Sequence, residues 1–249
     1  MLELSEHVTP QLVSPPGDRQ PATCWRCRTW NDRLREDQCW NCAQIADELD
    51  VPAMPLDLIA LYRKPSDLRD WLTCYKGRLD GSEPFVPEYV DIVRALLTRF
   101  FDDHGDRITA RAAVDCIVVV PSTNRPPPHP LHTILQGLDF QVPIHELLRR
   151  GEGDLGFNRP ARDGFVIAEK SSPLSVYLID DVYTTGARIN SAAVALTAGG
   201  HEVSGAFVMA RRVNPDYVPA AAEFWRQQAT QAFTWSASPV VNRRVAGWR

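Results

Sequence analysis

Apolar positions along the chain alternate between short continuous runs and stretches with a period near 3.6 residues. Continuous runs rich in branched residues are typical of strands buried on both faces; they occupy Val114–Val120, Val142–Leu148, Val176–Ile179 and Val203–Met209. Helical spacing is found in parts of Leu56–Arg78, in a segment beginning at Pro87, and in His132–Leu138, Ile189–Ala198 and Ala220–Ala232. Strands separated by helices predict an α/β fold with a doubly wound, mainly parallel sheet.

Composition divides the chain into three parts. Residues 1–22 are polar and proline-containing, and we expect them to be disordered. Residues 23–50 hold four of the six cysteines and form a small N-terminal module. Residues 51–249 form the main domain, which opens with a linker at Val51–Pro55. Within this domain we expect a helical hood segment (51–110), an α/β core (111–212) and a C-terminal extension (213–249).

The segment Val176–Arg188, VYLIDDVYTTGAR, is the most informative in the chain. An apolar run ends in two carboxylates, and a turn bearing hydroxyl groups and a glycine leads into a helix. Such a turn is a natural phosphate site, because backbone N–H groups at a helix N-terminus lack partners and the helix dipole favours an anion. Thr184 and Thr185 offer hydroxyl donors, and Gly186 lets the backbone approach a ligand closely.

Asp180 and Asp181 would repel a bare phosphate, so they should face another part of the ligand. Vicinal sugar hydroxyls donate hydrogen bonds, and ionised carboxylates accept them strongly. A carboxylate pair beside a phosphate site therefore predicts a sugar phosphate, with ribose 5-phosphate as the simplest case.

Val176–Arg188 resembles the signature of type I phosphoribosyltransferases, which bind 5-phosphoribosyl 1-diphosphate (PRPP). The resemblance implies that Asp180 and Asp181 hold the ribose hydroxyls at the catalytic centre. It also implies that the 5-phosphate is bound by Tyr183, Thr184, Thr185, Gly186, Ala187 and Arg188. Purine-salvage members carry a carboxylate where this chain has Thr184, so we do not expect that activity. Arg188 stands where many members have Thr or Ser, and it either contacts phosphate or points to solvent.

Ribosyl transfer requires groups that stabilise the leaving diphosphate, usually with Mg²⁺. In the resembled family the turn equivalent to Pro121–Arg125 holds the diphosphate, which makes Ser122 and Thr123 candidates. The Gly-rich, basic segment Arg149–Arg162 suits a mobile lid or a simple exposed loop. Further candidate diphosphate partners are Arg149, Arg150 and Lys76.

Four cysteines form two Cys-x-x-Cys pairs, Cys24 with Cys27 and Cys39 with Cys42. This spacing predicts a four-sulfur metal site, with structural zinc as the first interpretation. Two disulfides, a redox pair or iron in place of zinc remain open alternatives. A closed four-sulfur site has no free coordination position, so it should not be catalytic. The remaining pair, Cys74 and Cys116, are expected to be small buried hydrophobic residues.

A four-cysteine knuckle ahead of a type I phosphoribosyltransferase core resembles the ComF family. The resemblance implies an enzyme that transfers phosphoribosyl from Mg²⁺·PRPP to an unidentified nitrogen nucleophile. That family is linked to natural competence, so a second hypothesis is a non-catalytic accessory protein of DNA uptake that senses PRPP or a nucleotide. Its knuckle would then bind a competence partner or single-stranded DNA through aromatic and basic residues, unless the tryptophans only form a mini-core. Those residues are Trp25, Trp30, Trp40, Arg26, Arg28, Arg33 and Arg35.

The net charge of −4 and pI near 5.9 predict no global basic field for nucleic acid. No apolar run approaches the ~20 residues of a membrane span, and the N-terminus shows no signal-peptide pattern. We therefore expect a cytoplasmic protein without a membrane partner. The sequence indicates neither the acceptor nor the oligomeric state.

Overall fold

The computed structural model describes residues 1–249 except 18–19, 32–37, 123–124, 238–240 and 242–249. A five-stranded sheet with strand order β1-β7-β6-β2-β3 lies at its centre, and every pairing in that sheet is parallel. Its strands are β1 (Leu56–Tyr62), β2 (Cys116–Val119), β3 (Ile144–His145), β6 (Ser175–Tyr183) and β7 (Glu202–Arg212). The predicted α/β class and parallel sheet are thus confirmed.

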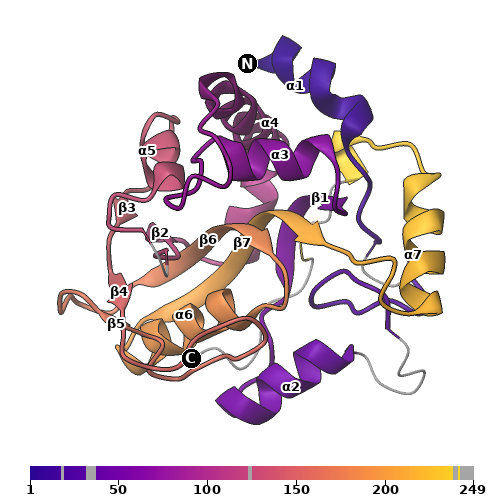
Figure 1. Ribbon diagram of the computed structural model, residues 1–249. Coiled ribbons are helices and arrows are strands. Elements are labelled where there is room, and N and C mark those ends of the chain that lie inside the picture. The colour runs from indigo at the N-terminus through magenta and orange to yellow at the C-terminus, as the bar shows by residue number, and fades with distance from the viewer. Residues whose placement is uncertain (18–19, 32–37, 123–124, 238–240, 242–249) are drawn as a thin grey trace.

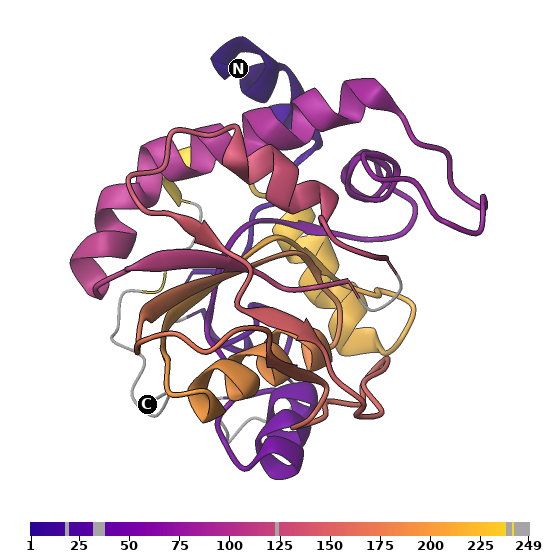
Figure 2. The same cartoon turned by 90° about the vertical axis from the view of Figure 1, so that its left-hand side faces the viewer.

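Helices cover both faces of the sheet (Figure 1). Leu178 of β6 packs in the hydrophobic core on the side of α6, whereas Tyr177 and Ile179 pack in the core on the side of α4. Figure 2 shows α6 and α2 on one side and α4 and α5 on the other. The helices are α1 (Leu2–Val8), α2 (Trp40–Leu49), α3 (Asp67–Cys74), α4 (Pro87–Arg111), α5 (Pro130–Gln136), α6 (Ala187–Ala198) and α7 (Pro219–Ala229), with short 3₁₀ turns at Thr9–Gln11 and Trp235–Ala237.

The predicted disorder of residues 1–22 is wrong for much of that segment. Helix α1 lies against α4 (Figure 1), and Val8 and Leu12 are buried in the core on that side of the sheet. Val13 then pairs with Leu61 of β1. Apolar residues spaced for one helical face explain the order, because they cover core that would otherwise be exposed.

The helical prediction for the start of the hood segment is also wrong, because Leu56–Tyr62 is strand β1. All seven of its residues are buried, so the strand shows no alternation of apolar and polar positions. Asp57 is fully buried, and its carboxylate accepts two hydrogen bonds from Arg111, at 2.8 and 2.7 Å, and one from Tyr177, at 2.7 Å. The Val51–Pro55 linker is likewise packed, since Ala53 and Met54 are fully buried.

The segment predicted as one strand at Val142–Leu148 contains the short strand β3 and the first residue of a second strand. After β3, the chain enters an antiparallel pair of β4 (Leu148–Arg150) and β5 (Phe165–Ile167). Among the described residues, no helix has the length and hydropathy needed to cross a membrane.

Candidate functional site

A cavity of about 820 Å³ lies at the edge of the sheet where the parallel strands end. Open α/β sheets bind ligands at this edge, because the ends of several strands and the loops after them meet there. Most of the predicted ligand residues line it, namely Lys76, Ser122, Arg150, Asp180, Asp181, Tyr183, Thr184, Thr185, Gly186, Ala187 and Arg188. Arg149 is exposed on β4 and does not line the cavity, so its predicted role is not supported. Thr123 lies outside the described residues.

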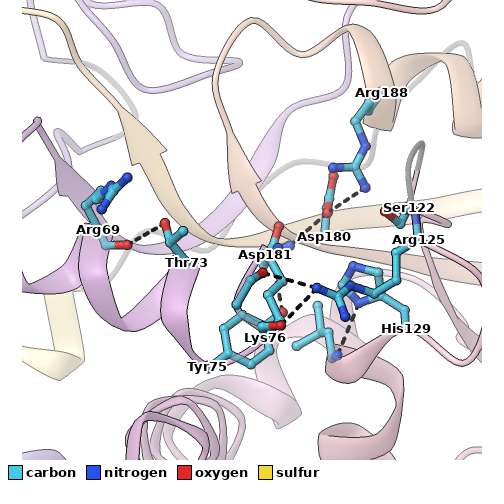
Figure 3. Close-up of polar contacts among 12 residues, drawn as sticks. Arg69, Thr73, Tyr75, Lys76, Ser122, Arg125, His129, Asp180, Asp181 and Arg188 are labelled. Atoms are coloured by element: carbon cyan, nitrogen blue, oxygen red, sulfur yellow. Dashed lines mark hydrogen bonds and ion pairs between the residues drawn. The ribbon is translucent and has the colours of Figure 1, made fainter. Parts of the chain in front are cut away.

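The two aspartates belong to the last part of β6, which runs on to Tyr183 rather than ending at Ile179. Both line the cavity floor, although each is only 2% exposed. Asp181 accepts a hydrogen bond from Tyr75 Oη at 3.1 Å and forms an ion pair with Lys76. Asp180 lies 3.4 Å from Arg188 Nη2 (Figure 3). Each of the two carboxyl groups thus has a cation beside it, Lys76 at Asp181 and Arg188 at Asp180.

The two carboxyl groups differ in their electrostatics. Burial raises the pKa of Asp180 to about 7, although the charge of Arg188 acts in the opposite direction. Burial also acts to raise the pKa of Asp181, but the charges of Lys76 and then His129 outweigh it and lower that pKa below its ordinary value. One neutral and one ionised carboxyl side by side is the stable arrangement for a buried pair below neutral pH.

We expect Asp180→Asn to gain stability over the wild type as the pH rises from 5 to 8. The folded wild type keeps a proton on Asp180 that the unfolded chain loses near pH 4, so this carboxyl increasingly destabilises the fold up to about pH 7. The stability difference between variant and wild type should therefore grow by roughly 1–3 kcal/mol over this range, measured by urea unfolding. Asp181→Asn is the matched control and should be destabilised at both pH values, because Lys76 loses its partner. A pH-independent difference for Asp180→Asn would contradict the assignment.

The turn after β6 is held in place by buried side chains. Arg211 donates to the carbonyl oxygens of Tyr183 at 3.4 Å and Thr184 at 2.5 Å, and Asn190 Nδ2 donates to the carbonyl of Gly186 at 2.8 Å. In a trans peptide the N–H points opposite to the preceding carbonyl. The N–H groups of Thr184, Thr185 and Ala187 therefore point away from these side chains. The same residues line the cavity, so the geometry is suited to an anion.

Gly186 is required at its position for two reasons. Its φ is +92°, and an added Cβ would lie 2.1 Å from Tyr183 Oη.

We expect Gly186→Ala to lower ribose 5-phosphate affinity at least tenfold and to cost roughly 1–3 kcal/mol of stability. Gly200→Ala is the control, because its φ is +89° but nothing lies within 4 Å of its added Cβ. That variant should cost about 1 kcal/mol and bind normally in calorimetry; equal binding by both variants would refute the role of Gly186.

The four cysteines of the two pairs come together and are buried. Their sulfur atoms all lie within 4.8 Å of one another, with 3.7 Å between Cys24 and Cys42 and 3.5 Å between Cys27 and Cys39. Sulfurs around a tetrahedral zinc, about 2.3 Å from the metal, are about 3.8 Å apart. The four cysteines are therefore positioned to hold a metal ion, consistent with structural zinc. Cys116 and Cys74 lie away from this cluster and are buried.

The cysteine module is not a separate domain, because it contributes to the same core as α6 and the sheet. Arg211, only 4% exposed, donates from Nε to the carbonyl of Cys27 at 3.2 Å while its Nη1 holds the turn. Its guanidinium also lies over the ring of Tyr183, 4.9 Å from the centroid. One buried side chain thus joins the cysteine module to the turn after β6.

Two further connections run from the N-terminal segment to the same turn. Asn158 has a φ of +53°, a left-handed conformation that asparagine tolerates better than most residues, and its side chain donates to Gln44 of α2 at 2.8 Å. Its backbone N–H donates to Thr185 Oγ1 at 3.2 Å. Asn190, which holds Gly186, accepts from the N–H of Met54 at 2.7 Å. The module and the residues after it therefore support the turn at three places.

The loop after β2 forms the other side of the cavity. Ser122 Oγ accepts from the N–H of Arg125 at 3.1 Å, and Arg125 Nη2 donates to the carbonyls of Lys76 and Gly77 at 2.9 and 3.1 Å (Figure 3). His129, also on this side, is buried, and burial lowers its pKa to about 4. This contact between the loop and the end of α3 places Ser122 and Lys76 on one side of the two aspartates.

Arg150 lines the cavity, but its guanidinium group makes its hydrogen bonds to backbone carbonyls of the segment predicted as a lid. It donates to the carbonyls of Gly151 at 2.9 Å, Gly153 at 2.7 Å and Gly164. These bonds brace the turn between β4 and β5. Arg150 therefore contributes its charge to the cavity, while its hydrogen bonds shape the loop.

The two basic residues of the knuckle that the structure describes, Arg26 and Arg28, are directed inward. Arg28 is fully buried, and Arg26 donates to the carbonyl of Ala53 at 2.5 Å and lies over Trp25. Arg33 and Arg35 lie outside the described residues. Trp40 is 56% exposed. The described part of the knuckle thus offers little of the basic surface that the nucleic-acid hypothesis needs.

Sequence reasoning missed Arg211, Asn190, Arg125 and His129. Arg211 lies two residues beyond the predicted strand Val203–Met209, and the residues before it are buried without alternation, so the local pattern gives no signal for its inward-pointing charge. The others act through contacts between residues far apart in the chain, such as Asn190 with Met54, which no local pattern reveals. Comparison with protein-family models and with curated proteins finds no match.

Proposed function

We propose that this protein binds Mg²⁺·PRPP and transfers its phosphoribosyl group to a nitrogen nucleophile. The observation that carries the proposal is the arrangement of Asp180, Asp181 and the turn from Thr184 to Ala187 around one cavity. Two carboxyl groups suit the vicinal hydroxyls of ribose, and the turn suits its 5-phosphate. This is the pattern expected of a type I phosphoribosyltransferase of the ComF kind.

The diphosphate would lie on the side of Ser122 and Lys76. Lys76 now pairs with Asp181, and ribose binding would release its ammonium group toward the diphosphate. Arg150 adds positive charge at the same cavity. The two aspartates and the diphosphate oxygens are the hard oxygen ligands that Mg²⁺ prefers, and the bound ion would neutralise charge on the leaving group.

In the transfer step the bond from C1 to the diphosphate oxygen breaks and a bond from C1 to the acceptor nitrogen forms. Diphosphate leaves as an anion, and the acceptor's proton passes to solvent. Among the described cavity residues, His129 is a poor general base, because burial lowers its pKa to about 4. Positioning and charge stabilisation would therefore supply most of the rate.

We further propose that the four cysteines bind zinc in a structural role. Four buried sulfurs close the coordination sphere and leave no position for substrate. The contact of Cys27 with Arg211 supports a role in shaping the neighbouring turn.

The direct test measures diphosphate released from PRPP and Mg²⁺ across a panel of nucleobases and amines, with metal content determined on the same sample. We expect release with at least one acceptor and one zinc ion per chain. PRPP binding without release under any condition would favour the sensing hypothesis, and absence of PRPP binding would reject the proposal.

A further inference from the structure

A second group of cations lies at the opposite end of the cavity from Ser122. It consists of Lys64, which follows β1, Arg69 in the first turn of α3, Arg78 after that helix, and Arg212 at the end of β7. We call these four residues the distal cluster. Figure 3 shows Arg69 on the other side of Asp181 from Ser122 and Arg125.

The distal cluster carries more positive charge than its neighbours neutralise. The charge of Arg69 is neutralised, because its guanidinium group forms ion pairs with Glu83 and Asp70. In the described part of the chain, the side chains of the other three cations form no hydrogen bond or ion pair. Asp80 also lines this end, but it is exposed and accepts from Ser82.

The cations are close enough to affect one another. Burial and then the charges of Arg212, Arg69 and Arg78 lower the pKa of Lys64. Glu83 acts in the opposite direction on Lys64, but it is already paired with Arg69. Like charges that exceed their counter-charges destabilise a fold unless a ligand neutralises them. A cavity wall of this kind recognises an anion.

The phosphates of PRPP do not account for these cations. Its 5-phosphate is assigned to the turn after β6, and its diphosphate to the side of Ser122 and Lys76. The cavity volume of about 820 Å³ is near the upper end of ligand sites and leaves room for a second reactant. The distal cluster borders this remaining space.

We propose that the acceptor carries a carboxylate or a phosphate, which binds among Lys64, Arg78 and Arg212 while its nitrogen faces the sugar. This inference rests on the proposed function. Arg212 is the central residue, because it is half-buried at the end of β7, whereas Lys64 and Arg78 are exposed. The acceptor class is then an amine or ring nitrogen compound with an acidic substituent.

The experiment uses full-length, metal-loaded protein saturated with ribose 5-phosphate and Mg²⁺·diphosphate. Inorganic phosphate is titrated in one arm and benzoate in the other, with binding followed by calorimetry. We expect a further site in the wild type and at least tenfold weaker binding in Arg212→Gln and in Lys64→Gln/Arg78→Gln. Tighter phosphate binding assigns a phosphorylated acceptor, and tighter benzoate binding assigns a carboxylate.

The matched control is Arg226→Gln, which removes an exposed arginine on α7 that pairs with Glu223. It should bind both probes like the wild type. Ribose 5-phosphate affinity is measured first in every variant. Normal ribose 5-phosphate binding, with no further anion site or one unchanged in the distal variants, overturns this inference alone. Absence of ribose 5-phosphate binding in the wild type overturns the proposed function and the inference with it.

Discussion

Removing the metal from the four cysteines should weaken ribose 5-phosphate binding at least tenfold. The guanidinium group of Arg211 donates through Nε to the carbonyl of Cys27 and through Nη1 to the carbonyl of Thr184. A structural metal fixes the knuckle backbone, so its loss should free the Cys27 carbonyl and loosen the turn. Calorimetry on protein treated with a chelator and then reloaded with zinc measures the effect. Binding that is equal with and without metal would contradict it.

Chelation can also unfold the protein, because the cysteines are part of the main core. Two variants separate this outcome from a local effect. Arg211→Met removes the connection and should weaken binding at least tenfold while the metal stays bound. Asn158→Gly removes the contact with Gln44 but keeps a residue suited to a φ of +53°, and it should weaken binding by a smaller factor. Normal binding by Arg211→Met would show that the metal site does not support the turn.

Replacing both aspartates with asparagine should lower PRPP affinity about a hundredfold or more. Above the Asp180 pKa of about 7, where both carboxyl groups are ionised, each would lose a charge-assisted hydrogen bond to a ribose hydroxyl, worth about 1.5–3 kcal/mol. The comparison is calorimetry of Mg²⁺·PRPP with wild type and with Asp180→Asn/Asp181→Asn. Equal affinities would reject the assigned ribose contacts.

A matched ligand pair distinguishes lost sugar contacts from a general change in the cavity. The wild type should prefer ribose 5-phosphate to 2-deoxyribose 5-phosphate, since the latter lacks one hydroxyl. In the double variant that preference should shrink, because the hydroxyl no longer meets a carboxylate. A preference that is unchanged would place the hydroxyl on other residues.

The strand, turn and helix around the two aspartates were predictable because their physical signals are local. A buried apolar run, a glycine at positive φ and a helix N-terminus all follow each other within Val176–Leu196. The cysteine cluster was predictable for the same reason, since two Cys-x-x-Cys turns each place two sulfurs together.

Strand β1 was misread because burial on both faces removes the alternation that marks a strand, and Leu58, Leu61 and Tyr62 also fit a helix. Asp57 within it reads as a polar break, yet Arg111 satisfies it from α4. The supports of the turn were not predictable either, because Arg211 reaches Cys27 across 184 positions of sequence. Local pattern thus indicates the cavity-lining segment, and tertiary packing determines what holds it in shape.

The most direct test of the central claim is a crystal structure of the protein with ribose 5-phosphate and Mg²⁺. We predict the phosphate within about 3 Å of the N–H groups of Thr184, Thr185 and Ala187, and the sugar hydroxyls within hydrogen-bonding distance of Asp180 and Asp181. A phosphate bound elsewhere, with Lys76 still paired to Asp181, would contradict the account.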